Sequence, residues 1–162
     1  MVSKRLTNLA GFAVCVALLA YGYVLQFLDE LEPCPLCVFQ RVAFFGLGTL
    51  FLAAALHNPG VIGARIYGVF LGIAAVIGAA IAGRHVWLQS LPPDQVPECG
   101  PGLEYMLNTF PLLETLRTVL SGSGECADVS WSFLGMTIPA WALLWFVALG
   151  LIGVARNFIG QR

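Results

Sequence analysis

Two cysteines separated by two residues are the side chains of this chain best suited to chemistry. Cys34 and Cys37 stand in the run Cys-Pro-Leu-Cys, and Arg41 follows Cys37 by four positions, about one helical turn. If a helix begins near Pro35, its positive end and the guanidinium of Arg41 both stabilise a thiolate at Cys37. Thiol pKa values fall from about 8.5 to about 3.5–7.5 in such settings. The motif therefore predicts a reactive pair that takes part in thiol–disulfide exchange.

Two further cysteines, Cys99 and Cys126, belong to a later polar stretch. Four cysteines permit three disulfide pairings, which the sequence alone does not decide, although local geometry favours pairing within each stretch. Two inert staples are one interpretation of these pairs. A purely structural disulfide does not need a neighbouring cation, so Arg41 favours the interpretation that Cys34 and Cys37 are reactive. Arg41 as a simple anchor at a membrane surface remains the alternative.

The composition is that of a membrane protein. Hydrophobic residues make up 59% of the chain and charged residues 10%, against roughly half and roughly a quarter in soluble domains. A helix needs about 20 apolar residues to cross the hydrocarbon core of a bilayer. Uncharged stretches that reach or approach this length lie at about residues 6–28, 42–56, 66–83 and 132–155. We therefore predict four membrane-spanning helices.

The second and third stretches indicate how these helices pack. The second is short, so Gln40 and Arg41 are expected in the interface, with the arginine side chain reaching toward water. The third is rich in small residues, namely Gly68, Gly72, Ala74, Ala75, Gly78, Ala79, Ala80, Ala82 and Gly83. Small residues let helix backbones approach closely in lipid. The predicted fold is an all-α membrane protein, a single four-helix transmembrane domain over residues 1–162.

Charged residues divide between the two ends of this bundle. Five of the eight basic residues lie on one side (Lys4, Arg5, Arg65, Arg156, Arg162) and all nine acidic residues on the other (Asp29, Glu30, Glu32, Asp94, Glu98, Glu104, Glu114, Glu125, Asp128). Basic loops stay in the cytoplasm, which predicts cytoplasmic N- and C-termini. The loops at about residues 29–41 and 84–131, with their four cysteines, then face an oxidising compartment. Cleavage of the first stretch as a signal peptide is not expected, because its apolar run exceeds the usual length of about 7–15 residues.

The second loop has a pattern of its own. Apolar residues recur in it at helical spacing (Leu103, Met106, Leu107, Phe110, Leu113, Leu116, Leu120), and Pro111 is expected to divide them into two short pieces. Such a stripe is typical of a short amphipathic helix lying in the membrane interface. Packing on the outer end of the bundle is the alternative. Either arrangement leaves Cys99 and Cys126 on tethered segments.

A polar cluster follows the third stretch, where His85 and Gln89 stand one helical turn apart. Both side chains can hydrogen-bond a carbonyl group. They fall in the same membrane leaflet as Cys37 and Arg41, so a lipid-soluble electron acceptor could meet a thiolate and polar groups together. Interfacial anchoring is the alternative, since Trp87 lies between them and tryptophan is common at membrane boundaries.

Together these motifs resemble the DsbB family of bacterial inner-membrane disulfide bond formation proteins. The resemblance rests on Cys-Pro-Leu-Cys-Val-Phe-Gln-Arg at 34–41, Arg-His-Val-Trp-Leu-Gln at 84–89, Pro-Glu-Cys-Gly at 97–100 and Gly-Glu-Cys-Ala-Asp-Val-Ser-Trp-Ser-Phe-Leu-Gly at 124–135. It covers nearly the whole chain, and the ordered set of four cysteines makes it specific.

The resemblance implies a relay of electrons through these cysteines. A periplasmic DsbA-like thioredoxin-fold protein would attack Cys99 with its reactive thiolate and free Cys126. The thiolate of Cys126 would attack Cys34 and liberate Cys37, which lies beside a quinone. By this resemblance the protein is a thiol:quinone oxidoreductase that generates disulfides.

The same resemblance implies a quinone site in the inner membrane. Ubiquinone is the usual acceptor in the family, and menaquinone is possible. Arg41, His85 and Gln89 would orient the quinone carbonyls, with Arg41 also holding the charge of the thiolate.

Other classes of protein remain as alternatives. One is a disulfide-stapled structural or metal-binding membrane protein without redox turnover; a zinc site is disfavoured because the second cysteine pair lacks a short ligand spacing, so no metal is expected. An enzyme of the vitamin K epoxide reductase type also has a four-helix bundle, but its Cys-x-x-Cys comes late in the chain. Cys15, alone within the first stretch, is interpreted as a small buried apolar residue.

Overall fold

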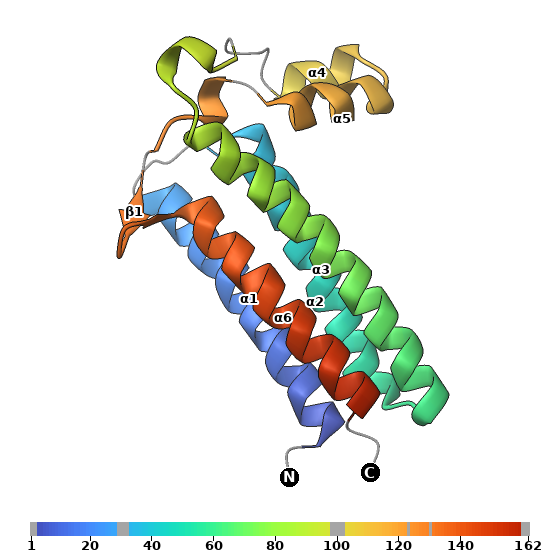
Figure 1. The fold of residues 1–162 in the computed structure, drawn as a ribbon. Helices are drawn as coiled ribbons and strands as arrows, with labels where there is room; N and C mark the ends of the chain where they lie inside the picture. The colour runs from blue at the N-terminus through green and yellow to red at the C-terminus, as the bar shows by residue number, and fades with distance from the viewer. Residues whose placement is uncertain (1–2, 29–32, 98–102, 123, 130, 160–162) are drawn as a thin grey trace.

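The computed structural model describes residues 3–28, 33–97, 103–122, 124–129 and 131–159, and in these the chain is a bundle of long helices (Figure 1). The long helices are α1 (Lys4–Leu28), α2 (Pro35–His57), α3 (Val61–Gln89) and α6 (Ile138–Ile159). Within the described ranges, these four helices are long and apolar enough to cross a membrane. The predicted all-α membrane bundle is confirmed. α1 begins and α6 ends at the same end of it (Figure 1).

The helices differ in length from the predicted spans. α2 and α3 both continue past Arg41 and Arg84, which bounded the apolar stretches in the sequence. An arginine on a long, flexible stem can reach water from a helix whose backbone remains at membrane depth, so a charge need not end the helix. α6 begins at Ile138 rather than near residue 132, because a short hairpin precedes it.

Small residues bring the helices close together. α3 packs most extensively on α6, while α1 packs on α2 and α2 on α3. A Cβ atom at Gly78 of α3 would overlap the ring of Phe146, and one at Gly150 of α6 would lie 2.6 Å from the Cβ of Ala75. The Phe146 ring in turn stacks on Phe44 of α2, with ring centroids 3.9 Å apart. The predicted role of the small residues of α3 is confirmed, since larger side chains would force α3 and α6 apart.

The outward faces of the long helices are apolar. Large exposed hydrophobic side chains on them include Phe45, Phe70, Val76, Ile77, Val147 and Leu151. Extended apolar surfaces are rare on soluble monomers, whereas the hydrocarbon core of a membrane shields such side chains from water. The protein is therefore a multi-pass membrane protein.

Short elements close the end of the bundle where α2 begins. They are the 3₁₀ turns Pro93–Gln95 and Gly124–Cys126, the helices α4 (Leu103–Thr109) and α5 (Leu112–Ser121), and the antiparallel strands β1 (Ser132–Phe133) and β2 (Met136–Thr137). Leu134 and Gly135 turn the hairpin with φ values of 53° and 76°. Two successive positive φ angles are typical of a tight hairpin turn, and the leucine at the first is unusual there.

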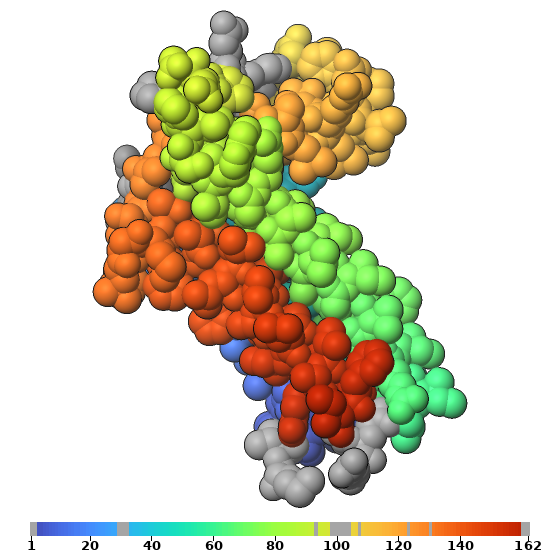
Figure 2. All heavy atoms as spheres, viewed as in Figure 1, coloured from blue at the N-terminus to red at the C-terminus, as the bar shows by residue number. Residues whose placement is uncertain are grey.

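The two helices of the second loop pack on the outer end of the bundle and keep an apolar face exposed. Pro111 separates α4 from α5, as the sequence indicates. Met106 and Val119 are buried against Leu36 of α2 and Leu88 of α3. All four leucines of α5, by contrast, are exposed (Leu112, Leu113, Leu116, Leu120). Figure 2 shows this segment overhanging the end of the bundle, which fits a helix held on the bundle with an apolar face toward a membrane interface.

Candidate functional site

The cysteine pair lies at the first turn of α2. Cys34 is the N-cap residue, and Pro35 occupies the first helical position, where its fixed φ favours the helix and no N–H is lost. The backbone N–H of Cys37 donates to the sulfur of Cys34 at 3.4 Å, and the two Sγ atoms are 3.1 Å apart in hydrogen-bond contact. The sulfur that caps the helix is therefore that of Cys34, whereas the sequence predicted that the helix start acts on Cys37.

His85 extends this arrangement from α3. Its side chain is buried, and its Nε2 atom lies 3.7 Å from the sulfur of Cys34. Its Nδ1 atom lies 3.0 Å from Nε2 of the buried Gln40 of α2. A Gln40 amide that donates to Nδ1 leaves the proton on Nε2, directed at the Cys34 sulfur. His85 thus contacts the thiol pair, which the sequence did not predict.

Arg41 connects α2 to α1. Within the described ranges, its guanidinium donates to Oε1 of Gln26 at 2.6 Å and to the carbonyl of Gly22 at 3.1 Å, and it lies 4.7 Å from the centroid of the Tyr23 ring. These partners fix the guanidinium at the wall of the cavity that Cys37 also lines. Arg41 and Cys37 therefore line the same cavity, as their spacing suggested, but the hydrogen bonds of the guanidinium are to α1.

Gln89 has an incomplete set of hydrogen bonds. Its Nε2 atom lies 3.5 Å from the carbonyl of Asp128, and its buried Oε1 atom has no partner among the residues that the structure describes. A buried amide oxygen without a hydrogen bond costs about 1–3 kcal/mol. Gln89 is therefore suited to a hydrogen-bonding ligand.

The remaining cysteines occupy different surroundings. Cys126 is buried in a cluster with Leu36 and Leu88, against which Cys34 packs. Cys126 and Cys34 therefore pack on the same apolar cluster. Cys99, the predicted partner of Cys126, lies outside the described residues. Cys15 is 1% exposed in the apolar core of the bundle, where the predicted packing role is confirmed.

The polar side chains converge on one cavity of about 150 Å³. Its lining includes Cys34, Cys37, Gln40, Arg41, His85 and Gln89, and its apolar wall is formed by side chains of α1, α2 and α6. An adjoining apolar groove of about 300 Å³ lies between α1 and α6 and is lined by Leu18, Tyr21, Trp131, Trp141 and Trp145, among others. α1 and α6 contact each other much less than α3 and α6 or α1 and α2 do. The cavity is thus continued along the membrane-facing side of the bundle.

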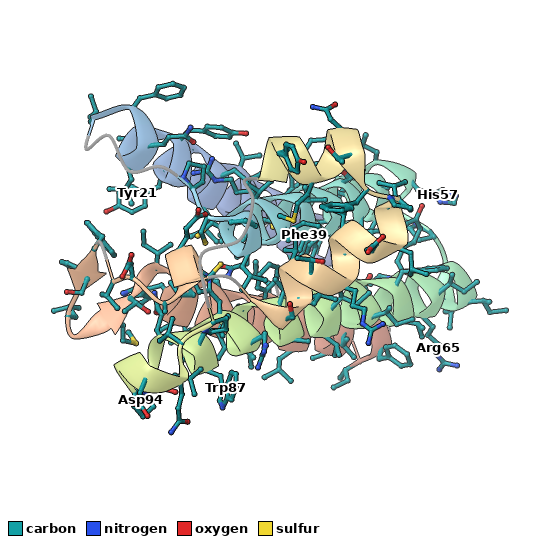
Figure 3. The ribbon with its side chains drawn as sticks, turned by 90° about the horizontal axis from the view of Figure 1, so that it is seen from above. Tyr21, Phe39, His57, Arg65, Trp87 and Asp94 are labelled. Atoms are coloured by element: carbon teal, nitrogen blue, oxygen red, sulfur yellow. The ribbon has the colours of Figure 1, made fainter. Side chains whose placement is uncertain are left out.

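The cluster after the third stretch divides between two faces of α3. Arg84 donates to the carbonyls of Leu120 and Ser121 and lies 4.1 Å from the centroid of the Trp87 ring. Figure 3, seen from above, shows Trp87 at the outer edge of the molecule. Arg84 therefore binds the end of α5 and, with Trp87, lies away from the thiol pair, whereas His85 faces inward.

Sequence reasoning missed two contributors to the site, Gln40 and Gln26. Gln40 follows Cys37 by three positions on the same helical face, and Gln26 interrupts an otherwise apolar run near the end of α1. A polar residue within a membrane helix usually faces the bundle interior and marks a functional position. This signal could have identified Gln26.

The fold and site define a class of protein: a helical membrane protein that holds a close pair of thiols beside a cavity at one end of its bundle. A family model described as "Disulfide bond formation protein DsbB" matches residues 4–155. A relative from Nitrosococcus oceani, named Disulfide bond formation protein B, is 54% identical over 153 residues, which cover 94% of this chain and 90% of the relative. One of the same name from Methylococcus capsulatus is 49% identical over 160 residues, covering 99% and 98%.

The chain belongs to the DsbB family of disulfide bond formation proteins. The resemblance expected from the ordered motifs is confirmed. A role in disulfide formation makes the protein an oxidoreductase, and the close pair of thiols at the start of α2 is chemically suited to that role.

Proposed function

We propose that the protein re-oxidises a periplasmic DsbA-like dithiol oxidase and passes the electrons to membrane quinone, as a protein disulfide:quinone oxidoreductase of the bacterial inner membrane. The observation that carries this proposal is the convergence of Cys34, Cys37, Arg41 and Gln89 on one cavity. The cavity continues into an apolar groove between α1 and α6. A polar head group and an apolar tail would both find suitable surroundings there.

The residues present fit a quinone, ubiquinone or alternatively menaquinone. Arg41 offers a cation at the cavity wall. Gln89 has a buried oxygen without a hydrogen bond in the described structure; in one orientation its amide accepts from a hydroxyl, and in the other it donates to a carbonyl. His85 lines the same cavity. When bound, a quinone accepts two electrons and two protons.

The chain's own residues would supply those electrons and protons from the thiol pair. Closing the Cys34–Cys37 bond from two thiols releases two protons and two electrons. His85 Nε2, 3.7 Å from the Cys34 sulfur, can exchange a proton with it, and Gln40 holds the imidazole in place. Arg41 stabilises negative charge developing in the cavity.

The second pair would receive the partner's electrons. In the proposed relay the partner's thiolate attacks Cys99, forming a mixed disulfide and freeing Cys126. The position of Cys126, buried in the cluster against which Cys34 packs, supports a following attack on Cys34. DsbA-like partners are strong oxidants near about −120 mV, so the dithiols alone cannot sustain net oxidation and an acceptor such as quinone must supply the drive.

The orientation proposed for the bundle places the cysteine end in the periplasm. Lys4, Arg5 and Arg156 lie at the opposite end, where α1 begins and α6 ends. The positive-inside rule then puts both termini in the cytoplasm.

Turnover of purified protein in detergent tests this function. A reduced thioredoxin-like dithiol protein and ubiquinone are added, and quinone reduction is followed optically. We expect catalytic turnover that is lost in Cys37→Ser. Cys15→Ala, which removes the buried cysteine of the span, should keep it. Absence of turnover in the wild type with both its disulfides and quinone present would support the disulfide-stapled structural alternative.

A further inference from the structure

We propose that Cys34, Cys37 and His85 form, in the reduced protein, a binding site for a thiophilic divalent cation such as Zn²⁺, and that occupation of this site holds the dithiol inactive. The Sγ atoms of the two cysteines and a ring nitrogen of His85 all lie within 4.8 Å of one another. The separate distances are 3.1 Å between the sulfurs and 3.7 Å from the Cys34 sulfur to Nε2.

These distances suit zinc. Zinc binds thiolate sulfur at about 2.3 Å and imidazole nitrogen at about 2.0–2.1 Å in tetrahedral geometry, so donor atoms in such a centre lie about 3.5–3.8 Å apart. The Cys34–His85 distance of 3.7 Å matches this spacing, the sulfur–sulfur distance of 3.1 Å is shorter, and the remaining pair lies within 4.8 Å. Three protein ligands leave a fourth position, and because all three residues line the cavity, water can occupy it.

Gln40 provides the outer contact that a ligating histidine needs. Metal-bound imidazole usually directs its other ring nitrogen to a hydrogen-bond acceptor, which fixes the ring and the tautomer. Nδ1 of His85 lies 3.0 Å from the Gln40 amide. For Nε2 to bind zinc, Nδ1 must carry the proton and donate to Oε1 of Gln40, which requires only that the amide turn over.

The oxidation state of the cysteines would decide whether the cation binds. Two thiols lose two protons as two zinc–sulfur bonds form, and no electrons move. A Cys34–Cys37 disulfide offers no thiolate, so the oxidised protein lacks the site. While zinc holds both thiolates, they cannot close a disulfide. Binding depends only on the thiols and His85, whereas the inhibition rests on the proposed quinone-linked function.

Zinc affinity is measured on full-length protein in detergent, reduced with a phosphine that is then removed, by competition with a zinc-binding dye. We expect one Zn²⁺ per reduced chain, held at least 100-fold more tightly than by the oxidised protein. His85→Ala should weaken binding at least tenfold. His57→Ala changes the other histidine, which is exposed and contacts Tyr67 near the start of α3, and should leave the affinity unchanged.

Two further measurements keep this test decisive. The double variant Cys99→Ser/Cys126→Ser removes the second pair of thiols and should still bind one Zn²⁺ when reduced. X-ray absorption of the zinc-loaded wild type should show two sulfur ligands and a histidine nitrogen, whether or not His85→Ala folds. Equal affinity in both oxidation states, loss of binding in the double variant or a spectrum without sulfur would overturn the proposal. Turnover of the same preparations without zinc tests the proposed function separately.

Discussion

The bundle buries polar side chains at both of its ends, and the two groups differ in how their hydrogen bonds are met. At the end where α1 begins and α6 ends, Asn8 and Asn157 are each 2% exposed. Asn157 donates to Oδ1 of Asn8 at 3.1 Å and to the carbonyl of Gly153 at 2.8 Å, and Asn8 donates back at 3.4 Å. The two amides satisfy one another across the helix interface.

At the opposite end, some polar side chains can still form further hydrogen bonds. The Oε1 atom of Gln89 has no hydrogen bond in the part of the chain that the structure describes, and the guanidinium of Arg41 borders the same cavity. The paired sulfurs can change their bonding altogether. Reciprocal amide pairs join helices, whereas partly satisfied groups around a cavity are ready for a ligand. We therefore assign a structural role to the end with Asn8 and Asn157, and a chemical role to the end with the cysteine pair.

Among substitutions that test the difference between the two ends, Arg41→Met is expected to lower the rate of quinone reduction most. Methionine retains an unbranched apolar stem but removes the charge and the hydrogen bonds to Gln26 and Gly22. Loss of a positioned donor of this kind costs about 100-fold in rate, so kcat/KM for quinone should fall by about that factor. Arg41→Lys should recover part of it, since lysine keeps the charge but not the fork geometry. An unchanged rate in Arg41→Met would limit the arginine to anchoring.

A smaller effect is expected from Gln40→Leu. The substitution removes the contact that holds Nδ1 of His85, so the imidazole should be less often aligned with the Cys34 sulfur. We expect about a tenfold lower turnover, the scale of a small misplacement of a catalytic group. Alkylation of reduced Cys34, followed by mass spectrometry, should slow as well. Loss of thermal stability with a normal alkylation rate would show that Gln40 serves packing alone.

The smallest effect is expected from Asn8→Leu at the structural end. It leaves Asn157 without one partner, and interhelical hydrogen bonds in membrane proteins contribute about 1 kcal/mol. The free energy of unfolding in micelles should fall by about that amount, while quinone reduction stays at the wild-type rate. The double variant Asn8→Leu/Asn157→Leu should recover part of the loss, because no amide is then left unpaired. A drop in turnover would contradict the assignment of this end to structure.

Much of the fold could be predicted from the sequence, because membrane insertion imposes few options on a chain. Long apolar runs must form helices, and the small residues of the third run identified the surface that contacts another helix. The ends of the helices were less predictable. α2 begins at Pro35 as expected, but α6 begins at Ile138 rather than near residue 132. The hairpin before α6 depends on a leucine at positive φ, Leu134, for which residue type gives no signal.

Most residues of the candidate site were predictable, but Gln26, Gln40 and the contacts among the side chains were not. Spacing placed Cys37 and Arg41 one helical turn apart on the same face, since residues i and i+4 of a helix are neighbours. That His85 approaches Cys34, and that Arg41 is held by α1, depends on how three helices pack. Local sequence does not contain that information. Membership of the DsbB family was predictable because the motifs occur in a fixed order along the whole chain.

Direct electron transfer from the Cys34–Cys37 dithiol to quinone can be tested without any partner protein. The variant Cys99→Ser/Cys126→Ser is reduced, freed of reductant and mixed with ubiquinone under anaerobic conditions. Quinol is quantified together with the thiols that remain. We predict one quinol formed per disulfide closed, and none when Cys34→Ser is added. Quinol formation in that triple variant, or thiols that stay reduced beside excess quinone, would contradict direct transfer from this dithiol.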